Sequence, residues 1–167
     1  MNLKTIFALI GLTIALASCG IYSLTGGQFS GAKTFSVSYL KPQTALATPI
    51  YAQRLTEGLK DVMLAQSPLK IVEQNGELQF EGSITGYQVS ANTVKGGAET
   101  AALNRLTITV KIKYTNSLES TYSFEKTFSK FADFEADKDL FTIQEDLWRQ
   151  INDQLAQEIY NASVGNW

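Results

Sequence analysis

The sequence predicts an α+β fold, a two-layer α/β sandwich in which two helices pack on one face of a mixed, largely antiparallel sheet of four or five strands. Two long segments carry apolar residues at helical spacing, and the remaining ordered segments alternate apolar and polar residues as half-buried strands do. Each predicted strand therefore has one apolar face, and each predicted helix has one apolar stripe. All of these surfaces are buried together if both helices cover the same face of the sheet.

The N-terminal half of the predicted domain begins with a strand from Thr34 to Leu40, and Lys41-Pro42 ends it. Thr48 and Pro49 then form an N-cap and first-turn proline. The helix that follows should end before Ser67-Pro68, because the residue before a proline avoids the helical region. Its apolar stripe consists of Tyr51, Leu55, Leu59, Val62 and Met63.

The central part of the chain predicts two more strands. Leu69 to Glu73 is a short strand candidate, and Asn75-Gly76 signals a tight turn after it. The strand from Leu78 to Val89 places Leu78, Phe80 and Ile84 on one face. Gly82 and Gly86 interrupt that face and predict a bulge or a closely packed helix.

The clearest alternation of the chain runs from Arg105 to Tyr114, after a predicted loop at Lys95-Gly96-Gly97. A turn at Asn116 to Ser120 follows, and a second apolar face then continues through Tyr122, Phe124 and Phe128. These two runs predict an antiparallel hairpin.

The C-terminal part is predicted to leave the sheet at Phe131-Ala132-Asp133-Phe134 and to enter a helix through a capping box, Thr142-Ile143-Gln144-Glu145. The helix repeats an apolar residue every four positions, with Trp148 beside the stripe of Leu147, Ile151, Leu155 and Ile159.

Alternating acids precede this helix, at Asp133, Glu135, Asp137 and Asp139. A calcium loop of the EF-hand type would need glycine and a bidentate glutamate where Lys138 and Gln144 stand. We interpret the acids as a lead-in to a helix N-terminus, where the helix dipole favours negative charge.

The N-terminus has the features of a lipoprotein signal. A positive charge at Lys4 precedes an apolar run from Ile6 to Ala17, which is too short to cross a bilayer. Leu16-Ala17-Ser18-Cys19 resembles a bacterial lipobox, in which the cysteine is lipidated and the new N-terminus is acylated with chains such as palmitate. Ordinary cleavage before Ser18, after Ala15-Leu16-Ala17, is the alternative.

The predicted organisation is therefore a removed signal peptide over residues 1–18, a lipidated N-terminus and glycine-containing tether over 19–32, and one domain over 33–167.

Composition excludes several functions. Residues 19–167 keep all of the 14 basic residues except Lys4 and all 16 acidic residues, so their net charge is −3, which is not the balance of a nucleic-acid-binding protein. Histidine is absent, and Cys19 is the only cysteine. The commonest general base and the usual zinc ligands are therefore missing. We predict no enzyme activity, no metal site and no cofactor beyond the covalent lipid on Cys19.

The polar face of the predicted strands is the candidate functional surface, because the helices cover the other face. Such a face is commonly just solvated. Its short hydroxyl side chains also suit docking of a partner, through Thr107, Thr109, Thr121, Ser123 and Thr127. We further predict that Arg105, Lys111 and Lys113 bind a phosphate or carboxylate. The remaining residues of this polar face are Gln79, Glu81, Ser83, Thr85 and Glu125.

Several segments, in order, resemble the LptE family of lipopolysaccharide-assembly lipoproteins of Gram-negative outer membranes. They are Cys19-Gly20-Ile21-Tyr22-Ser23, Leu78-Gln79-Phe80-Glu81-Gly82, Ala102-Leu103-Asn104-Arg105-Leu106-Thr107-Ile108, Phe131-Ala132-Asp133-Phe134 and Asn166-Trp167.

The resemblance implies an α/β sandwich that sits inside an LptD-type β-barrel as plug and assembly aid, with lipopolysaccharide as a ligand. It also implies a lipid-anchored protein at the outer membrane, on the periplasmic side or inside the barrel lumen. The alternative function is a generic periplasmic lipoprotein that scaffolds another envelope complex.

Overall fold

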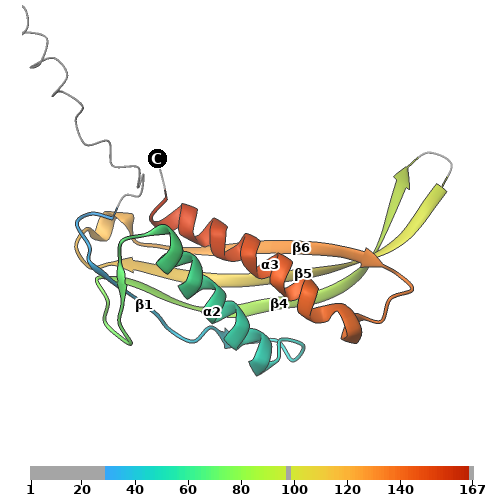
Figure 1. The fold of residues 1–167 in the computed structure, drawn as a ribbon, viewed down its shortest axis with the longest axis horizontal. Coiled ribbons are helices and arrows are strands. Elements are labelled where there is room, and N and C mark those ends of the chain that lie inside the picture. The colour runs from blue at the N-terminus through green and yellow to red at the C-terminus, as the bar shows by residue number, and fades with distance from the viewer. Residues whose placement is uncertain (1–28, 97–98, 166–167) are drawn as a thin grey trace, which may run out of the picture.

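Two layers form the protein in the computed structural model, which describes residues 29–96 and 99–165 (Figure 1). The predicted signal peptide, Cys19, most of the tether, Gly97 and Asn166-Trp167 lie outside these residues. The elements in chain order are β1 (Thr34–Val37), β2 (Lys41–Pro42), α2 (Pro49–Gln66), β3 (Lys70–Ile71), β4 (Leu78–Gly96), β5 (Glu99–Asn116), η1 (Ser120–Tyr122), β6 (Phe124–Glu135) and α3 (Leu140–Ser163).

The sheet is mixed, as predicted, and six strands make it up in the described part of the chain. Their order is β3-β1-β4-β5-β6, with β2 also paired to β4. The β1 strand is parallel to β3 and β4, whereas β4, β5 and β6 run antiparallel over long registers. The strand predicted from Thr34 to Leu40 already ends at Val37, and Lys41-Pro42, predicted to end it, form the separate strand β2 beside Ser83 and Ile84. A proline is tolerated there because β2 lies at an edge.

Helix α2 begins and ends where the sequence predicts. The Thr48 hydroxyl accepts a hydrogen bond from the Tyr51 N–H at 3.2 Å, and Pro49 occupies the first turn. Ser67 is extended, as a residue before proline prefers, and it ends the helix.

Helix α3 begins earlier than the capping box predicts. Its N-cap is Asp139, whose carboxylate accepts a hydrogen bond from the Phe141 N–H at 3.1 Å. Thr142 lies inside the first turn, and its hydroxyl donates to the Asp139 carbonyl at 2.7 Å. Aspartate and threonine are both good caps, so the capping-box pattern does not by itself decide between Asp139 and Thr142.

Strand β6 continues through Phe131–Phe134, so the prediction that these residues leave the sheet is wrong. They pair with β5 up to Glu135 opposite Leu103. The alternation persists on the helix side, where Ala132 and Phe134 are buried. Lys130 interrupts that apolar pattern because its ammonium pairs with Glu158 of α3 at 3.2 Å.

The predicted bulge in β4 is confirmed between Ile84 and Gly86. Beyond it the apolar parity changes, and Tyr87 takes the inward position. Gly82 marks a close approach of β5 and not of a helix, because a Cβ atom there would lie 2.3 Å from the Lys111 carbonyl oxygen.

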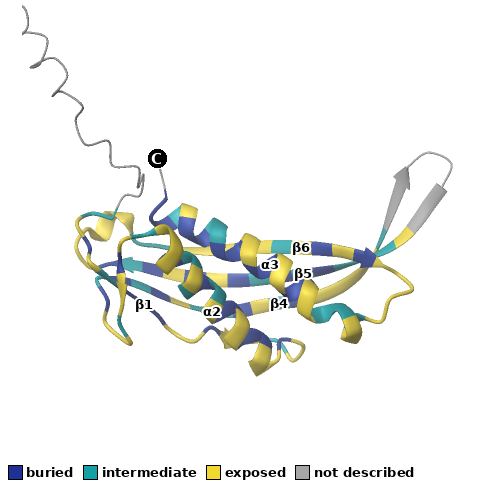
Figure 2. Cartoon of the chain, viewed as in Figure 1, coloured by how far each residue is buried: buried dark blue, intermediate teal, exposed yellow. Residues whose placement is uncertain are grey.

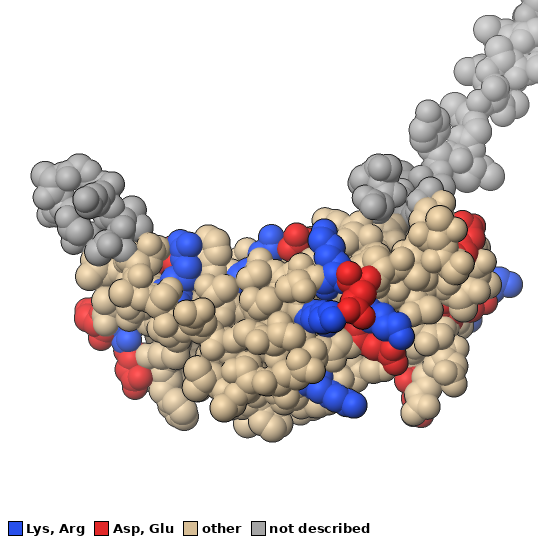
Figure 3. All heavy atoms as spheres, turned by 180° about the vertical axis from the view of Figure 1, so that it is seen from behind, with Lys and Arg blue, Asp and Glu red and all other residues tan. Residues whose placement is uncertain are grey.

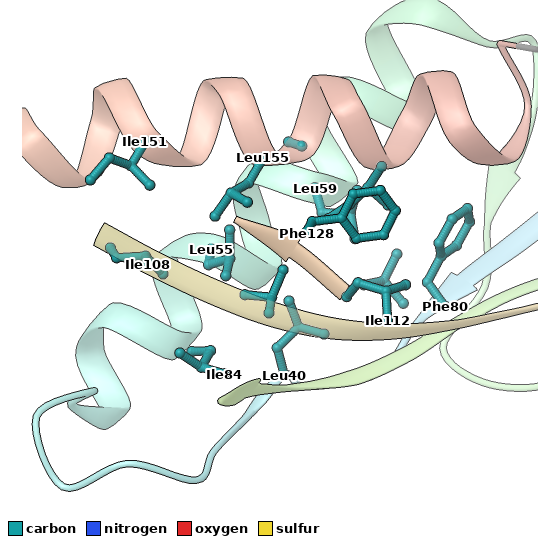
Figure 4. Close-up of a cluster of buried hydrophobic side chains, with 14 of the residues drawn as sticks. Leu40, Leu55, Leu59, Phe80, Ile84, Ile108, Ile112, Phe128, Ile151 and Leu155 are labelled. Carbon is teal, nitrogen blue, oxygen red and sulfur yellow. The ribbon is translucent and has the colours of Figure 1, made fainter. Parts of the chain in front are cut away.

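The core lies between the helices and one sheet face (Figures 2 and 4). The predicted stripes of both helices meet the alternate residues of β5 there, and each such side chain contributes about 1.5–3 kcal/mol when it is fully buried. Residues without exposed surface include Leu55, Leu59, Phe80, Ile108, Ile112, Ile151 and Leu155.

Two hydrogen bonds satisfy polar groups in this core. The Tyr51 hydroxyl donates to the side-chain amide oxygen Oδ1 of Asn152 at 2.8 Å and so joins α2 to α3. The Trp148 indole N–H donates to the Tyr87 hydroxyl at 2.9 Å and so joins α3 to β4. Burial raises the pKa of Tyr51 well above its usual range, so this hydroxyl stays neutral.

Candidate docking surface

The sheet face opposite the helices is open, and it carries the side chains that the sequence assigned to it. Figure 3 shows this side from behind: residues of both charge signs gather together, and the rest of the surface is mostly uncharged. On β5 the two faces separate cleanly. Thr107, Thr109 and Lys111 alternate with buried Ile108 and Val110.

Thr121 and Ser123 do not lie on a strand of this surface. Thr121 belongs to η1, and Ser123 follows it directly. The Ser123 hydroxyl accepts a hydrogen bond from the Asn116 N–H at 3.0 Å, so it closes the turn between β5 and β6. Thr127 does lie on β6, paired with Lys111.

Each of the three predicted anion-binding cations is already paired with a carboxylate on a neighbouring strand. Arg105 binds Asp133 through two hydrogen bonds, of 2.7 and 2.8 Å. In two of the pairs the register places the acid directly opposite the cation, whereas Glu125 lies opposite Lys113 and pairs with Lys111 on the diagonal. The other pairs are Lys113 with Glu81, at 3.5 Å, and Lys111 with Glu125.

Two of the pairs lower the pKa of their carboxylate. Hydrogen bonds from Arg105 lower the pKa of Asp133, and the hydrogen bond from Lys111 lowers the pKa of Glu125. The Asp133 hydrogen bond raises the pKa of Arg105 in turn. Exposed pairs of this kind stabilise a fold little, so their main effect is to make the surface nearly neutral.

The three cations form two separate groups. Lys111 and Lys113 line a shallow hollow of about 280 Å³, whose other residues are Gln43, Glu81, Gly82, Ser83 and Glu125. Arg105 lies six residues along β5 from Lys111, which is roughly 20 Å at strand rise. Its guanidinium stacks on the Phe131 ring, 3.6 Å from the centroid.

Hydroxyl side chains occupy the surface between the two groups. The Thr109 and Ser129 hydroxyl oxygens lie 3.0 Å apart across β5 and β6. The sequence prediction included Thr109 but missed Ser129, and it missed the exposed Phe131 because it ended the sheet at that residue. The signal was the apolar alternation of Phe128, Ala132 and Phe134, which Lys130 interrupts once.

A second hollow, of about 580 Å³, lies between α2 and α3. Arg54 and Glu145 form an ion pair across it at 3.2 Å. Its lining also includes Glu57, Asp61, Trp148 and Asp153. Among residues 29–96 and 99–165, no group of three or more acidic, histidine or cysteine side chains is placed to hold a metal ion. Within those same ranges, none of the helices has the length and apolar character needed to cross a bilayer.

Comparison with known proteins gives one family. The LptE family, described as lipopolysaccharide-assembly, matches residues 32–163. No curated protein sequence matches the chain significantly.

Solved structures share the fold at very low sequence identity. A neuraminyllactose-binding hemagglutinin homolog from Helicobacter pylori is 8% identical with a TM-score of 0.52, over 79% of this chain and 83% of that one. A hypothetical protein from Chlamydia trachomatis is 6% identical with a TM-score of 0.51, over 81% and 99%. A Xanthomonas campestris protein is 9% identical with a TM-score of 0.51, over 78% and 84%. These likenesses support the α+β architecture alone.

Proposed function

The chain belongs to the LptE family of lipopolysaccharide-assembly proteins, and we propose that it is the plug and assembly aid of an LptD-type outer-membrane β-barrel. In this proposal lipid on Cys19 anchors the protein at the outer membrane, on the periplasmic side or inside the barrel lumen. The protein binds and positions other molecules and catalyses no reaction.

The observation that carries the proposal is the open, nearly neutral face of β4, β5 and β6. The core is complete without this face, because both helices pack on the other side. Its surface consists of short hydroxyl groups and internally paired charges. Barrel interiors are lined by polar side chains, so a flat polar face with few unpaired charges can contact such a wall without leaving buried charges unpaired.

Co-purification in detergent tests the proposed partnership. A tagged, lipidated chain expressed in a Gram-negative host that carries the cognate barrel should retain a large outer-membrane barrel protein. The double variant Thr107→Arg with Thr127→Arg should lose most of that protein, because it adds two unpaired charges to the open face. Gln53→Arg with Gln150→Arg, at exposed positions of α2 and α3, is the matched control and should retain it.

If the wild-type chain retains no barrel, the proposal fails. Retention of a different envelope complex would favour the general scaffolding function instead.

We also propose that Lys111 and Lys113 contact phosphate groups of lipopolysaccharide, with Arg105 as a separate contact. A phosphate must displace Glu125 and Glu81 to do so, so binding should weaken as salt rises. Reversing these charges would place like charges opposite each other across the strands. Neutral substitutions therefore test the site more cleanly.

Lys111→Gln with Lys113→Gln should weaken binding of purified lipopolysaccharide about tenfold, since charge-assisted hydrogen bonds are lost. Lys60→Gln with Arg149→Gln is the matched control, because both cations are also paired with acids but lie on α2 and α3, which cover the other face of the sheet. Titration calorimetry measures the affinity, and equal affinities for the two double variants would remove the lysine pair from the proposal.

A further inference from the structure

One edge of β4 is unpaired over the second half of its described length. The strands β1 and β2 pair with β4 only as far as Ile84, and the last hydrogen bond on this side runs from the Gln43 N–H to the Ile84 carbonyl, at 2.9 Å. The β4 strand itself continues to Gly96, paired with β5 on its other side. Among the described residues, Tyr87 to Asn92 therefore have a strand neighbour on one side only.

The geometry of the ladder identifies the free main-chain groups. Before the bulge, the Phe80 and Ile84 carbonyls accept hydrogen bonds from the β1–β2 segment, so alternate residues direct both main-chain groups toward this edge. The bulge between Ile84 and Gly86 shifts the alternation by one residue. Tyr87, Val89 and Ala91 are then the residues whose N–H and C=O groups point away from β5.

The unpaired edge of β4 differs from the edge at β6 in how it is protected against pairing. The β6 edge strand carries Lys126 and Lys130, and charged side chains of this kind discourage pairing with another strand. The stretch from Gly86 to Asn92 contains no charged residue and no proline. Another strand can therefore pair with the β4 edge, whereas the lysines on β6 disfavour pairing there.

The β4 edge is anchored to the core through Tyr87, and exposed apolar side chains lie near it. Tyr87 is buried beneath the helices, where its hydroxyl accepts the Trp148 hydrogen bond and its ring lies 5.7 Å from the Tyr51 ring. Val89, on the same side of β4, is 41% exposed. The starts of α2 and α3 lie at the same end of the molecule and expose Ile50 and Phe141 (Figure 1).

We propose that the β4 edge at Tyr87 to Asn92 binds an extended, uncharged segment of the barrel partner as an added β-strand. A row of main-chain donors and acceptors recognises an extended polypeptide, and the lack of charge on the edge matches an uncharged one. A closed barrel wall has no free strand edge, so the segment comes from a loop or a terminus of that partner. This inference rests on the proposed function.

Hydrogen exchange of the main-chain amides tests the inference in the purified barrel complex. The Tyr87, Val89 and Ala91 amides should exchange at least about tenfold more slowly in the complex than in the free chain, because each gains a hydrogen-bond partner. The Gln88 and Ser90 amides already face β5 and serve as the internal control. Their exchange should change much less.

A variant pair tests the same edge by affinity. Val89→Pro removes one outward N–H and leaves the ladder to β5 intact, so it should weaken the complex about tenfold. Val89→Thr keeps the N–H and should behave as the wild type does. Circular dichroism checks that both variants fold. If Val89→Pro does not fold, the hydrogen-exchange measurement alone tests whether a strand is added at this edge.

The outcomes separate the two proposals. A complex in which Tyr87, Val89 and Ala91 exchange as fast as in the free chain overturns the strand addition but leaves the barrel partnership standing. Failure to form any complex overturns both. Slow exchange of these amides in the isolated chain, together with a dimer in sedimentation, would mean that a second copy occupies the edge, and this also overturns the proposal.

Discussion

Glu77 shows how a single side chain ties two parts of the sheet together. Its carboxylate accepts hydrogen bonds from the main-chain N–H groups of Lys33 and Thr34, the second at 3.0 Å. The Glu77 N–H donates to the Thr34 hydroxyl at 3.1 Å in return. The start of β1 is thereby fastened to the start of β4, although the two lie more than forty residues apart in the chain. The hydrogen bonds from Lys33 and then Thr34 lower the pKa of Glu77.

The lowered pKa predicts that Glu77 makes the stability of the fold depend on pH in the acidic range. The stabilisation from the ionised Glu77 carboxylate is complete above the ordinary glutamate pKa of about 4.3. It is lost as the pH falls through the lower pKa of Glu77 in the folded state. The free energy of unfolding should therefore be higher for the wild type than for Glu77→Gln at pH 7, and the gap should narrow toward about pH 3. Urea titrations across this range measure the gap. A gap that does not change with pH would contradict the prediction, and Glu119→Gln, an exposed acid before η1, is the control.

The start of a helix can be located from the local sequence only where a single residue is suited to be the N-cap. Helix α2 has a single start, because Thr48-Pro49 satisfies both the cap and the first turn. Helix α3 has two candidate caps, and packing selected Asp139, which adds one turn to the helix and brings Leu140 and Ile143 against the core.

The choice of cap predicts a difference between two substitutions. Asp139→Ala removes the acceptor of the Phe141 N–H and should lower the free energy of unfolding by about 1 kcal/mol. Thr142→Ala should cost less than about 0.5 kcal/mol, because the hydroxyl only donates to a carbonyl inside the first turn. Thermal and denaturant unfolding of both variants gives the comparison. A larger cost for Thr142→Ala would show that the helix starts at the predicted capping box.

In the whole molecule, the sheet extends beyond the two helices that pack on it. The β6 strand ends at Glu135 opposite Leu103, whereas β4 and β5 continue to pair up to Gly96 and Glu99. Figure 1 shows this extension as an arm that projects beyond the two layers. A hairpin of two strands alone is marginally stable in water, so the arm adds little to the stability of the domain.

Shortening the arm should therefore leave the fold intact. Replacing residues 93–102 by Asn-Gly closes β4 and β5 with a two-residue turn between Asn92 and Leu103, which are paired partners whose main-chain groups face each other. The free energy of unfolding should change by less than about 1 kcal/mol. A loss of more than about 2 kcal/mol in urea unfolding would mean that the arm is part of the cooperative unit.

Local patterns in the sequence predict both helices, the antiparallel hairpin of β5 and β6, the bulge near Gly86 and the polar face around Thr107 and Thr109. Periodicity and capping are local, so they can be read from neighbouring residues. Only the tertiary structure decided the parallel pairs of β1 and β2 with β4, the extension of β6 through Phe131, and the pairing of Arg105, Lys111 and Lys113 with acids. Strand order and register bring distant residues together, and a cation shows its acidic partner only when the neighbouring strand is in place.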